Sequence, residues 1–334
     1  MKQLNIGFLG AKHTHYIDFG RYAQQSPYCR VAGVWDDDPE KTARFAAALK
    51  APVYESYQAM LADPAVDGVV ITSTPYMHEE HIIAAAKAGK AVFVEQPLAV
   101  TNEAAERIRD AVKESGIPFV LSNPVKRSGY LFAKQLLDSG LMGEPLNMRV
   151  RTLHDNTVLL EQGKFPDFEY IYDHAQSGGG AMNNMGCHGV KLLLWFFGMP
   201  ETAAGIFTSL TERGKANNIE ENAVTVFKFP NGAIGTIETG WVHPRYQGNW
   251  ELNCTHGSVI QTPDGLYYRL DCRGDGWVKA MDKLLPAPMD HPFTYWVEHL
   301  YNGTPMDEFG VDEAVAFTRM IVAAYNSQGR EVPV

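Results

Sequence analysis

The stretch LNIGFLGAKHTH, residues 4–15, decides how the first part of this chain folds. Residues 4–9 form an apolar run typical of a buried strand, and a helical pattern starts near His15. Gly10 opens the turn between them, where the phosphates of a dinucleotide would rest on a helix N-terminus. The strict glycine fingerprint is not met, because its second and third glycines fall on Lys12 and His15. A plain structural turn therefore stays an equal alternative.

Outward from this stretch, short apolar strands alternate with helical patterns as far as about residue 122. The predicted strands cover residues 4–9, 31–35, 68–72, 91–94 and 118–121. The predicted helices begin near His15 and Pro39, and two more span residues 78–88 and 102–114. This alternation predicts a parallel sheet covered on both faces, and the handedness rule for crossovers makes it doubly wound. We therefore expect an α/β domain over residues 1–122.

The pattern changes after about Asn123, and the remainder is rich in strands separated by turns. A helix is predicted over residues 127–139, and two more near 293–301 and 311–327. The predicted strands cover residues 145–153, 222–229, 233–240, 250–254, 258–262 and 266–270. The turn Pro230-Asn231-Gly232 joins two of them as a hairpin. We therefore expect an α+β domain with an open, mostly antiparallel sheet over residues 123–334.

The composition excludes several classes of protein. A net charge of −10 argues against nonspecific binding to nucleic acid. No apolar run reaches the roughly 18 residues that a membrane span needs, and the N-terminus leads straight into a strand pattern without a signal peptide. The four cysteines, Cys29, Cys187, Cys254 and Cys272, lack CxxC spacing. They favour reduced thiols in a cytoplasmic protein over a disulfide frame or a zinc site.

Three acids end the second predicted strand. Asp36 stands where an acid typically binds the ribose 2′-hydroxyl of a dinucleotide. Asp37 and Asp38 beside it would repel a 2′-phosphate, so the pattern favours NAD over NADP. Helix capping before Pro39 is the alternative, and it accounts for Asp37 or Asp38 better than for Asp36.

A candidate acid/base lies in the segment GGGAMNNMGCH, residues 178–188. Its three glycines leave bare backbone that allows close approach to a ligand or to another segment. Asn184 follows, and His188 opens an apolar helical run over residues 190–197. With an unperturbed pKa near 6.5, a histidine there suits proton exchange. A buried structural histidine is the alternative.

Five segments together resemble one family of proteins. They are TPYMH (74–78), AGKAVFVEQPL (88–98), the triple-glycine segment, NGTP (302–305) and SQGR (327–330). In this order they resemble the Gfo/Idh/MocA family, named after glucose–fructose oxidoreductase and inositol dehydrogenase. The resemblance implies a Rossmann domain, a substrate domain with an open sheet, and hydride exchange between a nicotinamide and a sugar or polyol carbon.

The resemblance also implies a catalytic trio, of which two members are exchanged here. The family typically carries lysine where this chain has Gln96, and aspartate where it has Asn184. The family's histidine is present as His188. Both amides can form hydrogen bonds, but neither titrates near neutral pH. His188 is then the one member of the trio that is able to exchange a proton. Lys191, three residues beyond it, either compensates as a cation or is a solvated surface lysine.

The same resemblance implies two sets of binding residues. The cofactor set is Gly10, Ala11, Lys12, His13, Asp36, Asp37, Ser73, Thr74, Pro75, His78, Glu95, Gln96 and Asn123. The substrate set is Lys126, Tyr172, His174, Asn184, His188, Trp241 and His243. Several members have plainer alternatives: a solvated lysine for Lys126, an ordinary loop for Tyr172 and His174, and a core aromatic for Trp241.

These observations favour an NAD(H)-dependent oxidoreductase acting on a sugar, inositol or related polyol, with His188 as the proton-exchanging residue. The alternatives are a redox-assisted lyase or glycosidase with tightly bound NAD, and a nonredox ligand-binding or regulatory protein on the same fold. His13, His15, His78 and His81 fall on different predicted elements, so we expect no metal site. We expect a homodimer or homotetramer, and no nucleic-acid or membrane partner.

Overall fold

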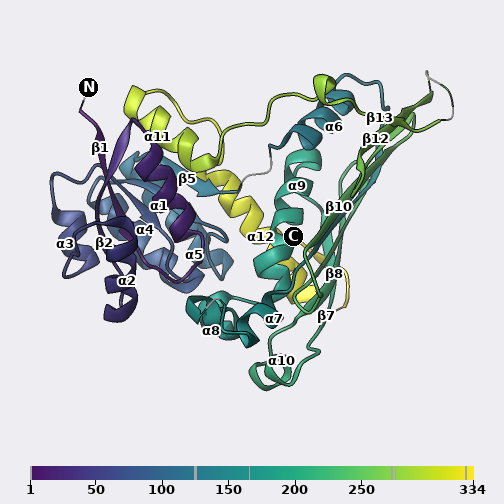
Figure 1. Cartoon of the computed structure of the whole chain (residues 1–334). Helices are drawn as coiled ribbons and strands as arrows, with labels where there is room; N and C mark the ends of the chain where they lie inside the picture. The colour runs from purple at the N-terminus through teal and green to yellow at the C-terminus, as the bar shows by residue number, and fades with distance from the viewer. Residues whose placement is uncertain (1, 124–125, 165, 272–273, 275, 328) are drawn as a thin grey trace. The chain divides into compact units, whose positions relative to one another are not determined.

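The computed structural model describes residues 2–334 except 124–125, 165, 272–273, 275 and 328 (Figure 1). Cys272, Pro124 and Gln328, on which parts of the sequence argument rest, lie outside the described residues. The chain forms two compact units. The first comprises Met1–Asn123, Gln162–Gly179 and Asp290–Thr318, and the second comprises Pro124–Glu161, Gly180–Met289 and Arg319–Val334. The division into domains 1–122 and 123–334 stays a prediction. Its boundary lies beside the first change of unit, but each unit also takes in later segments.

The first unit contains a five-stranded sheet in the order β2-β1-β3-β4-β5, and every neighbouring pair is parallel. Its strands are β1 (Leu4–Leu9), β2 (Cys29–Trp35), β3 (Gly68–Ile71), β4 (Ala91–Glu95) and β5 (Phe119–Ser122). The helices between them are α1 (Tyr16–Gln25), α2 (Pro39–Leu49), α3 (Tyr57–Ala62), η1 (Pro75–Met77), α4 (His78–Lys87) and α5 (Asn102–Ser115). This confirms the predicted doubly wound domain, including the order of its elements.

Later segments complete the first unit. They are η2 (Pro166–Tyr172), α8 (His174–Ser177), α11 (Pro292–Asn302) and the first part of α12 (Val311–Ser327). Helix α11 packs on the sheet through aromatic side chains: the rings of Phe293 and Phe93 meet edge to face, 5.5 Å apart between centroids. Trp296 is wholly buried beside them. The burial of apolar area that stabilises this sheet therefore draws on residues nearly two hundred positions away in the sequence.

The second unit contains a nine-stranded sheet in the order β13-β12-β11-β10-β6-β9-β8-β7-β14. Its neighbours are antiparallel except β6 and β9, which are parallel. The strands are β6 (Pro145–Leu153), β7 (Thr202–Thr208), β8 (Asn222–Lys228), β9 (Ile234–Gly240), β10 (Gln247–Cys254), β11 (Gly257–Thr262), β12 (Gly265–Leu270), β13 (Val278–Lys279) and β14 (Val332–Pro333). The predicted open, mostly antiparallel sheet is confirmed, although the sequence analysis did not identify β7, β13 and β14.

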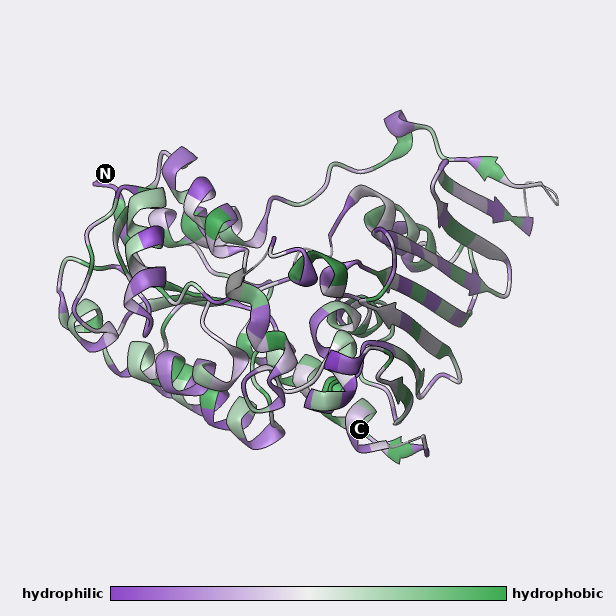
Figure 2. Cartoon of the chain, turned by 60° about the horizontal axis from the view of Figure 1, so that its bottom comes forward, coloured by the Kyte–Doolittle hydropathy of each residue, from purple (hydrophilic) through white to green (hydrophobic). Residues whose placement is uncertain are grey.

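The second unit also contains helices. They are α6 (Ser128–Asp138), α7 (Asn156–Glu161), the π-helical turn η3 (Met182–Gly186), α9 (Cys187–Phe197), α10 (Glu212–Asn217) and η5 (Asp282–Leu284). Hydrophobic and hydrophilic residues alternate along the strands, as Figure 2 shows. In β8, Ala223, Thr225 and Phe227 are buried, whereas Val224 and Val226 are exposed. Buried α9 and η3 therefore cover one face, and the exposed residues form the other.

Among the described residues, no helix is both long enough and apolar enough to cross a membrane.

Candidate active site

The turn after β1 is held against the ends of two neighbouring strands. The backbone N–H of Gly10 donates to the oxygen of Trp35 at 2.7 Å, and the N–H groups of Lys12 and His13 each lie 3.2 Å from the oxygen of Thr72. Gly10 has φ +88°, and a Cβ there would lie 2.5 Å from the backbone nitrogen of Ser73. Only glycine fits this position, because both the left-handed backbone and the close approach to β3 exclude a side chain.

Asp36 lies at the end of β2 and is 5% exposed. Its carboxylate accepts hydrogen bonds from the backbone N–H groups of Ala11 at 2.6 Å and Asp38 at 2.9 Å. Lys12 Nζ lies 3.2 Å from Asp36 and 2.6 Å from Asp37. Two carboxylates and one ammonium group leave a net negative charge at this strand end. Such a charge would repel a 2′-phosphate, in keeping with the predicted preference for NAD over NADP.

Burial raises the pKa of Asp36, and its contact with Asp37 adds to this. For Asp37 burial acts the same way, but hydrogen bonding with Asp36 and the ammonium of Lys12 outweigh it, so its pKa lies below the ordinary value. Asp38 has a different task. It caps α2 by accepting from the N–H groups of Glu40 and Lys41, as the capping alternative expected of one of these acids.

Two buried polar atoms at the carboxyl edge of the first sheet have no hydrogen-bond partner among the described residues. They are Thr74 Oγ1, which follows β3, and Asn123 Oδ1, which follows β5. An unsatisfied buried polar atom costs about 1–3 kcal/mol. Ligands of open parallel sheets bind outside the carboxyl ends of the strands. A polar ligand at this edge would satisfy both atoms, so the residues present fit a dinucleotide there.

His78 links two loops of this edge rather than standing apart from them. Its Nδ1 lies 3.0 Å from the oxygen of Pro97, and its Nε2 lies 3.1 Å from the oxygen of Ser73. Burial lowers the pKa of His78 to about 4, so the ring is neutral at pH 7. The ring lies between the loop after β3 and the loop after β4, and in its neutral form it donates to one of these two oxygens at a time. Direct contact between His78 and the cofactor stays a prediction.

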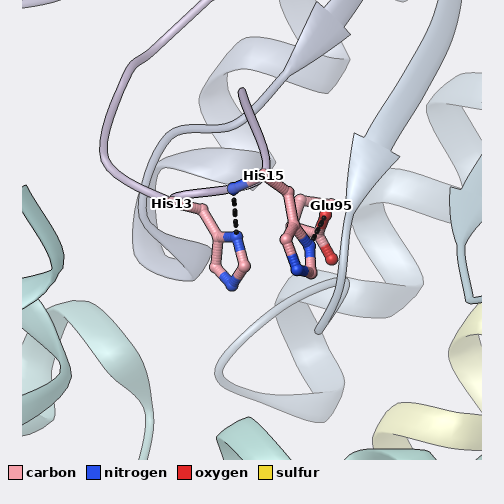
Figure 3. A group of neighbouring side chains, drawn as sticks. All are labelled: His13, His15 and Glu95. Atoms are coloured by element: carbon pink, nitrogen blue, oxygen red, sulfur yellow. Dashed lines mark hydrogen bonds and ion pairs between the residues drawn. The ribbon is translucent and has the colours of Figure 1, made fainter. Parts of the chain in front are cut away.

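The structure brings together three residues that the sequence analysis did not combine: His13, His15 and Glu95 (Figure 3). The two histidines belong to the turn after β1, and Glu95 ends β4. One ligand atom of each lies within 4.8 Å of the others, a spacing that could hold a metal ion. The sequence signal was available, because parallel strands end at the same edge of a sheet and each residue follows or ends one.

The hydrogen bonds within this cluster indicate how the rings of His13 and His15 are protonated. The N–H of His15 donates to His13 Nδ1 at 3.3 Å, so a neutral His13 ring carries its proton on Nε2. His15 Nδ1 lies 3.0 Å from Glu95 Oε2. Burial alone would lower the pKa of His15, but the carboxylate of Glu95 outweighs it and the pKa is raised. With these hydrogen bonds the two histidine rings offer N–H donors rather than free lone pairs to a ligand. The expected absence of a metal site stays a prediction.

In the second unit, a buried carboxylate holds the triple-glycine segment. Glu220 Oε2 accepts from the N–H of Gly180 at 2.9 Å, and Oε1 accepts from the N–H of Met182 at 3.0 Å. The hydroxyl of Tyr325 donates to Oε1 at 2.6 Å and accepts from the N–H of Asn183 at 3.0 Å. Because the glycines carry no side chains, the carboxylate of Glu220 can approach their backbone closely. Sequence reasoning missed both Glu220 and Tyr325, since neither stands in a recognisable motif.

Asn184 lies in the π-helical turn η3, at the end of this held segment. Its Oδ1 accepts from Asn156 Nδ2 and from Trp241 Nε1, both at 3.1 Å. Trp241 is wholly buried, which agrees with the core-aromatic alternative, yet its indole also contacts the predicted site residue. His188 is half-buried in the first turn of α9. These two hydrogen bonds therefore fix the position of the Asn184 amide oxygen.

The two lysines differ from a solvated surface residue. Lys191 is 1% exposed, so that interpretation is wrong for it. The reason is that α9 is apolar nearly all round, and such a helix buries whatever it carries. Lys126 is half-buried, and its Nζ lies 5.6 Å from the centroid of the Trp195 ring. Substrate contact by Lys126 stays a prediction.

The remaining predicted residues are divided between the units. Gln96, Tyr172 and His174 belong to the first unit, and Asn184, His188, Trp241 and His243 belong to the second. Tyr172 is buried, His174 is exposed at the start of α8, and His243 is half-buried after β9. The amide oxygen of Gln96 accepts from Asn123 Nδ2 at 2.5 Å. The roles assigned to these residues stay predictions.

Comparison with known proteins finds one family over most of the chain. Residues 4–122 match the model GFO_IDH_MocA, described as an oxidoreductase family with an NAD-binding Rossmann fold. Residues 130–260 match the model of the GFO/IDH/MocA C-terminal domain. The two matches follow one another and together span more than half of the chain.

Three individual proteins that this chain resembles share between 19% and 37% of its residues over the matched regions. An inositol 2-dehydrogenase of Pseudomonas fluorescens Pf-5 is 37% identical over 147 residues, which cover 43% of this chain and 44% of that protein. The matched region is thus under half the length of that relative. A 2,7-anhydro-N-acetylneuraminate hydratase of Escherichia coli K12 is 26% identical over 266 residues, covering 77% of this chain and 65% of that protein. The structure of a levoglucosan dehydrogenase with NADH and levoglucosan shares the fold, with a TM-score of 0.81, 19% identity and full coverage of both chains.

Proposed function

This chain belongs to the Gfo/Idh/MocA family of oxidoreductases, and on that premise we propose that it is an NAD(H)-dependent oxidoreductase of a sugar, inositol or related polyol. The observation that carries the proposal is the carboxyl edge of the first sheet. There the turn at Gly10 and the buried acid Asp36 match what a dinucleotide requires, and the atoms of Thr74 and Asn123 that lack partners among the described residues suit a polar ligand.

The cofactor would be held by the residues predicted for it. Asp36 would bind the adenosine ribose, and the turn that contains Ala11, Lys12 and His13 would face the phosphates at the N-terminus of α1. When bound, the nicotinamide supplies a hydride acceptor for the substrate carbon. Asp36 Oδ2 accepts one hydrogen bond, from the N–H of Ala11, and a carboxylate oxygen can accept a second one, so a ribose hydroxyl would bind there.

The proton would pass through His188. Oxidation of a hydroxyl releases one proton together with the hydride, and His188 is the member of the trio that can accept it. Gln96 and Asn184 would position the substrate by hydrogen bonds. The family resemblance supports grouping these three residues. His188→Ala should lower turnover by about 10²- to 10⁴-fold and leave NAD affinity nearly unchanged. Unimpaired turnover in that variant would end the proposed mechanism.

A substrate panel tests the activity itself. Sugars, inositols and other polyols are followed at the nicotinamide absorbance with NAD and with NADP in parallel. We expect reduction of NAD by at least one polyol or sugar, and slower reduction of NADP. An absence of reduction across the panel, with cofactor binding intact, would contradict the proposal.

A redox-assisted lyase is the second candidate, because two neutral amides replace the charged members of the trio and one relative is named a hydratase. A bound NAD would serve there as a transient hydride acceptor and donor, so that a substrate ketone would acidify the neighbouring C–H before elimination. Nicotinamide fluorescence of the purified protein separates the candidates. Bound cofactor without net reduction favours the lyase, and no bindable cofactor favours a nonredox ligand-binding protein.

The exposed face of the second sheet supports a proposed homodimer or homotetramer. Ile206 of β7 is 69% exposed and pairs in register with Val224 of β8, which is also exposed. Val226 and Ile234 add to this apolar area. Exposed apolar patches of this kind mark protein–protein interfaces. Light scattering that shows a monomer at micromolar concentration would contradict the assembly. A cytoplasmic location remains part of the same proposal.

A further inference from the structure

We propose that Asn184 presents its amide N–H groups to the substrate, and so selects sugars that offer an oxygen without a proton, a carboxylate or a carbonyl. This inference rests on the proposed function, since it takes Asn184 as a substrate contact. It adds to it a chemical class of substrate. The inference comes from the orientation of one side chain.

The orientation of the Asn184 amide is fixed by a group that can only donate. Oxygen and nitrogen of an amide look alike, so their assignment normally follows from the surrounding hydrogen bonds. The indole N–H of Trp241 is a donor without any acceptor capacity. It lies 3.1 Å from the atom assigned as Asn184 Oδ1. A flipped amide would place two donors against each other, so the oxygen faces Trp241.

The surroundings hold this arrangement in place. Trp241 is wholly buried. Its backbone N–H donates to the backbone oxygen of Glu221 at 2.9 Å, and its backbone oxygen accepts from the N–H of Thr157 at 3.3 Å. Asn156, which is also buried, supplies a second donor to Asn184 Oδ1 at 3.1 Å. The N–H of Asn184 itself donates to the oxygen of Gly180 at 3.0 Å. Both lone pairs of Oδ1 are thus used by the protein.

Asn184 therefore meets a ligand through Nδ2, which carries two N–H donors. Among the described residues, the hydrogen bonds of the Asn184 side chain are both made by Oδ1, and the residue is half-buried. The family's aspartate would accept a proton from a substrate hydroxyl and would repel a substrate carboxylate. An amide donor can bond to a hydroxyl oxygen as well, but it attracts a carboxylate instead of repelling it. Hydrogen bonds to charged acceptors are about twice as strong as neutral ones, so a carboxylate gains the most.

Gln96 does not allow the same argument. Its partner Asn123 is itself an amide, and turning both side chains over would keep their 2.5 Å hydrogen bond. Asn123 Oδ1 is buried and has no partner within the part of the chain that the structure describes, so the present assignment carries no advantage there. The donor-only indole is what makes Asn184 different. The inference is accordingly confined to the second unit.

The test compares matched ligands on the wild-type protein and on Asn184→Asp. Aspartate keeps an oxygen for Trp241 and Asn156, so the fold is retained, but it removes the donor and adds a negative charge. The probes are D-glucuronate against D-glucose, and scyllo-inosose against myo-inositol. Calorimetry without added cofactor measures binding in the absence of turnover. Asn217→Asp adds the same charge on exposed helix α10 and serves as the matched control.

We expect the wild-type protein to bind glucuronate or inosose at least about tenfold more tightly than its hydroxyl partner. Asn184→Asp should lose this preference, and Asn217→Asp should keep it. A preference for glucuronate alone identifies a carboxylate, and one for inosose alone identifies a carbonyl. Equal or weaker binding of both by the wild-type protein, or an unchanged preference in Asn184→Asp, would overturn the inference. Failure of the proposed function is distinct, because it appears as absent NAD reduction in the separate assay.

Discussion

Replacing Gly180 by alanine should disrupt the segment that carries the predicted site residues of the second unit. A Cβ at this position would overlap the backbone oxygen of Glu220 and would lie 2.6 Å from its Oε2. Ordinary contacts begin at 3.4 Å, so the side-chain contact alone is about 0.8 Å too short. Neither atom can move easily, because Glu220 holds three donors and its backbone oxygen accepts from the N–H of Ala181 at 3.0 Å.

The magnitude follows from what must give way. Overpacking a buried position costs about 1–3 kcal/mol. Moving the segment away from Glu220 also breaks the bonds from Gly180 and Met182, and each buried hydrogen bond left unmade costs about 1–3 kcal/mol. We therefore expect Gly180→Ala to lower the free energy of unfolding by about 3–9 kcal/mol.

Urea unfolding followed by tryptophan fluorescence measures this loss, because Trp195, Trp241 and Trp250 all lie in the second unit. Gly276→Ala is the matched control, since a Cβ there meets nothing within 4 Å and the residue is exposed. It should change stability by less than about 0.5 kcal/mol. Under conditions where Gly180→Ala is still folded, turnover should fall while NAD affinity stays close to that of the wild type.

The opposite result would refute the reasoning directly. If the free energy of unfolding of Gly180→Ala lies within about 0.5 kcal/mol of the wild-type value, then Glu220 does not occupy the space that the glycine leaves. If stability falls but turnover per folded molecule does not, the segment between Gly180 and His188 does not position catalytic groups.

Three further substitutions test the first unit. Asp36→Ala should weaken NAD binding and narrow the gap between NAD and NADP affinities, and tighter binding of NADP than NAD by the wild-type protein would contradict the assignment. Glu95→Gln should lower the pKa of His15, as read from its ring resonances by NMR. Because folding raises the pKa of His15, the His15–Glu95 ion pair stabilises the fold fully below about pH 6.5 and less as the pH rises through the pKa of the folded protein. If Glu95→Gln leaves the pH dependence of the unfolding free energy unaltered, the ion pair does not contribute to stability. Gln96→Lys should preserve or raise activity on polyols, and a collapse of the native reaction would favour the lyase.

Much of the fold could be predicted from local patterns. The strands of the first sheet, the hairpin after Phe229 and the long C-terminal helix over 311–327 follow from apolar runs, turn residues and helical periodicity, which act between near neighbours. The strand Thr202–Thr208 was missed because its alternating small and apolar residues give a weak signal. Short edge strands such as Val332–Pro333 owe their pairing to a neighbour, so no local pattern announces them.

The candidate site shows the same limit more sharply. The family motifs indicated Asn184 and His188 by position, but which way the amide of Asn184 is turned depends on Trp241, 57 residues away. The pairing of His15 with Glu95 spans 80 residues, and that of Glu220 with Tyr325 spans 105. Residue types and spacing cannot report these contacts, because each partner alone has many permissible surroundings.

The sequence by itself determined most of the strands and longer helices in their order, the parallel and antiparallel character of the two sheets, the family and its NAD-binding domain. These depend on periodicity and on glycine and proline positions, which are local properties of the chain. Tertiary structure alone decided that Lys191 is buried, that Glu220 fills the space beside Gly180, and that Asn184 turns its oxygen toward the protein. The physical reason is that burial and hydrogen-bond direction are set by whichever distant groups the fold brings within reach.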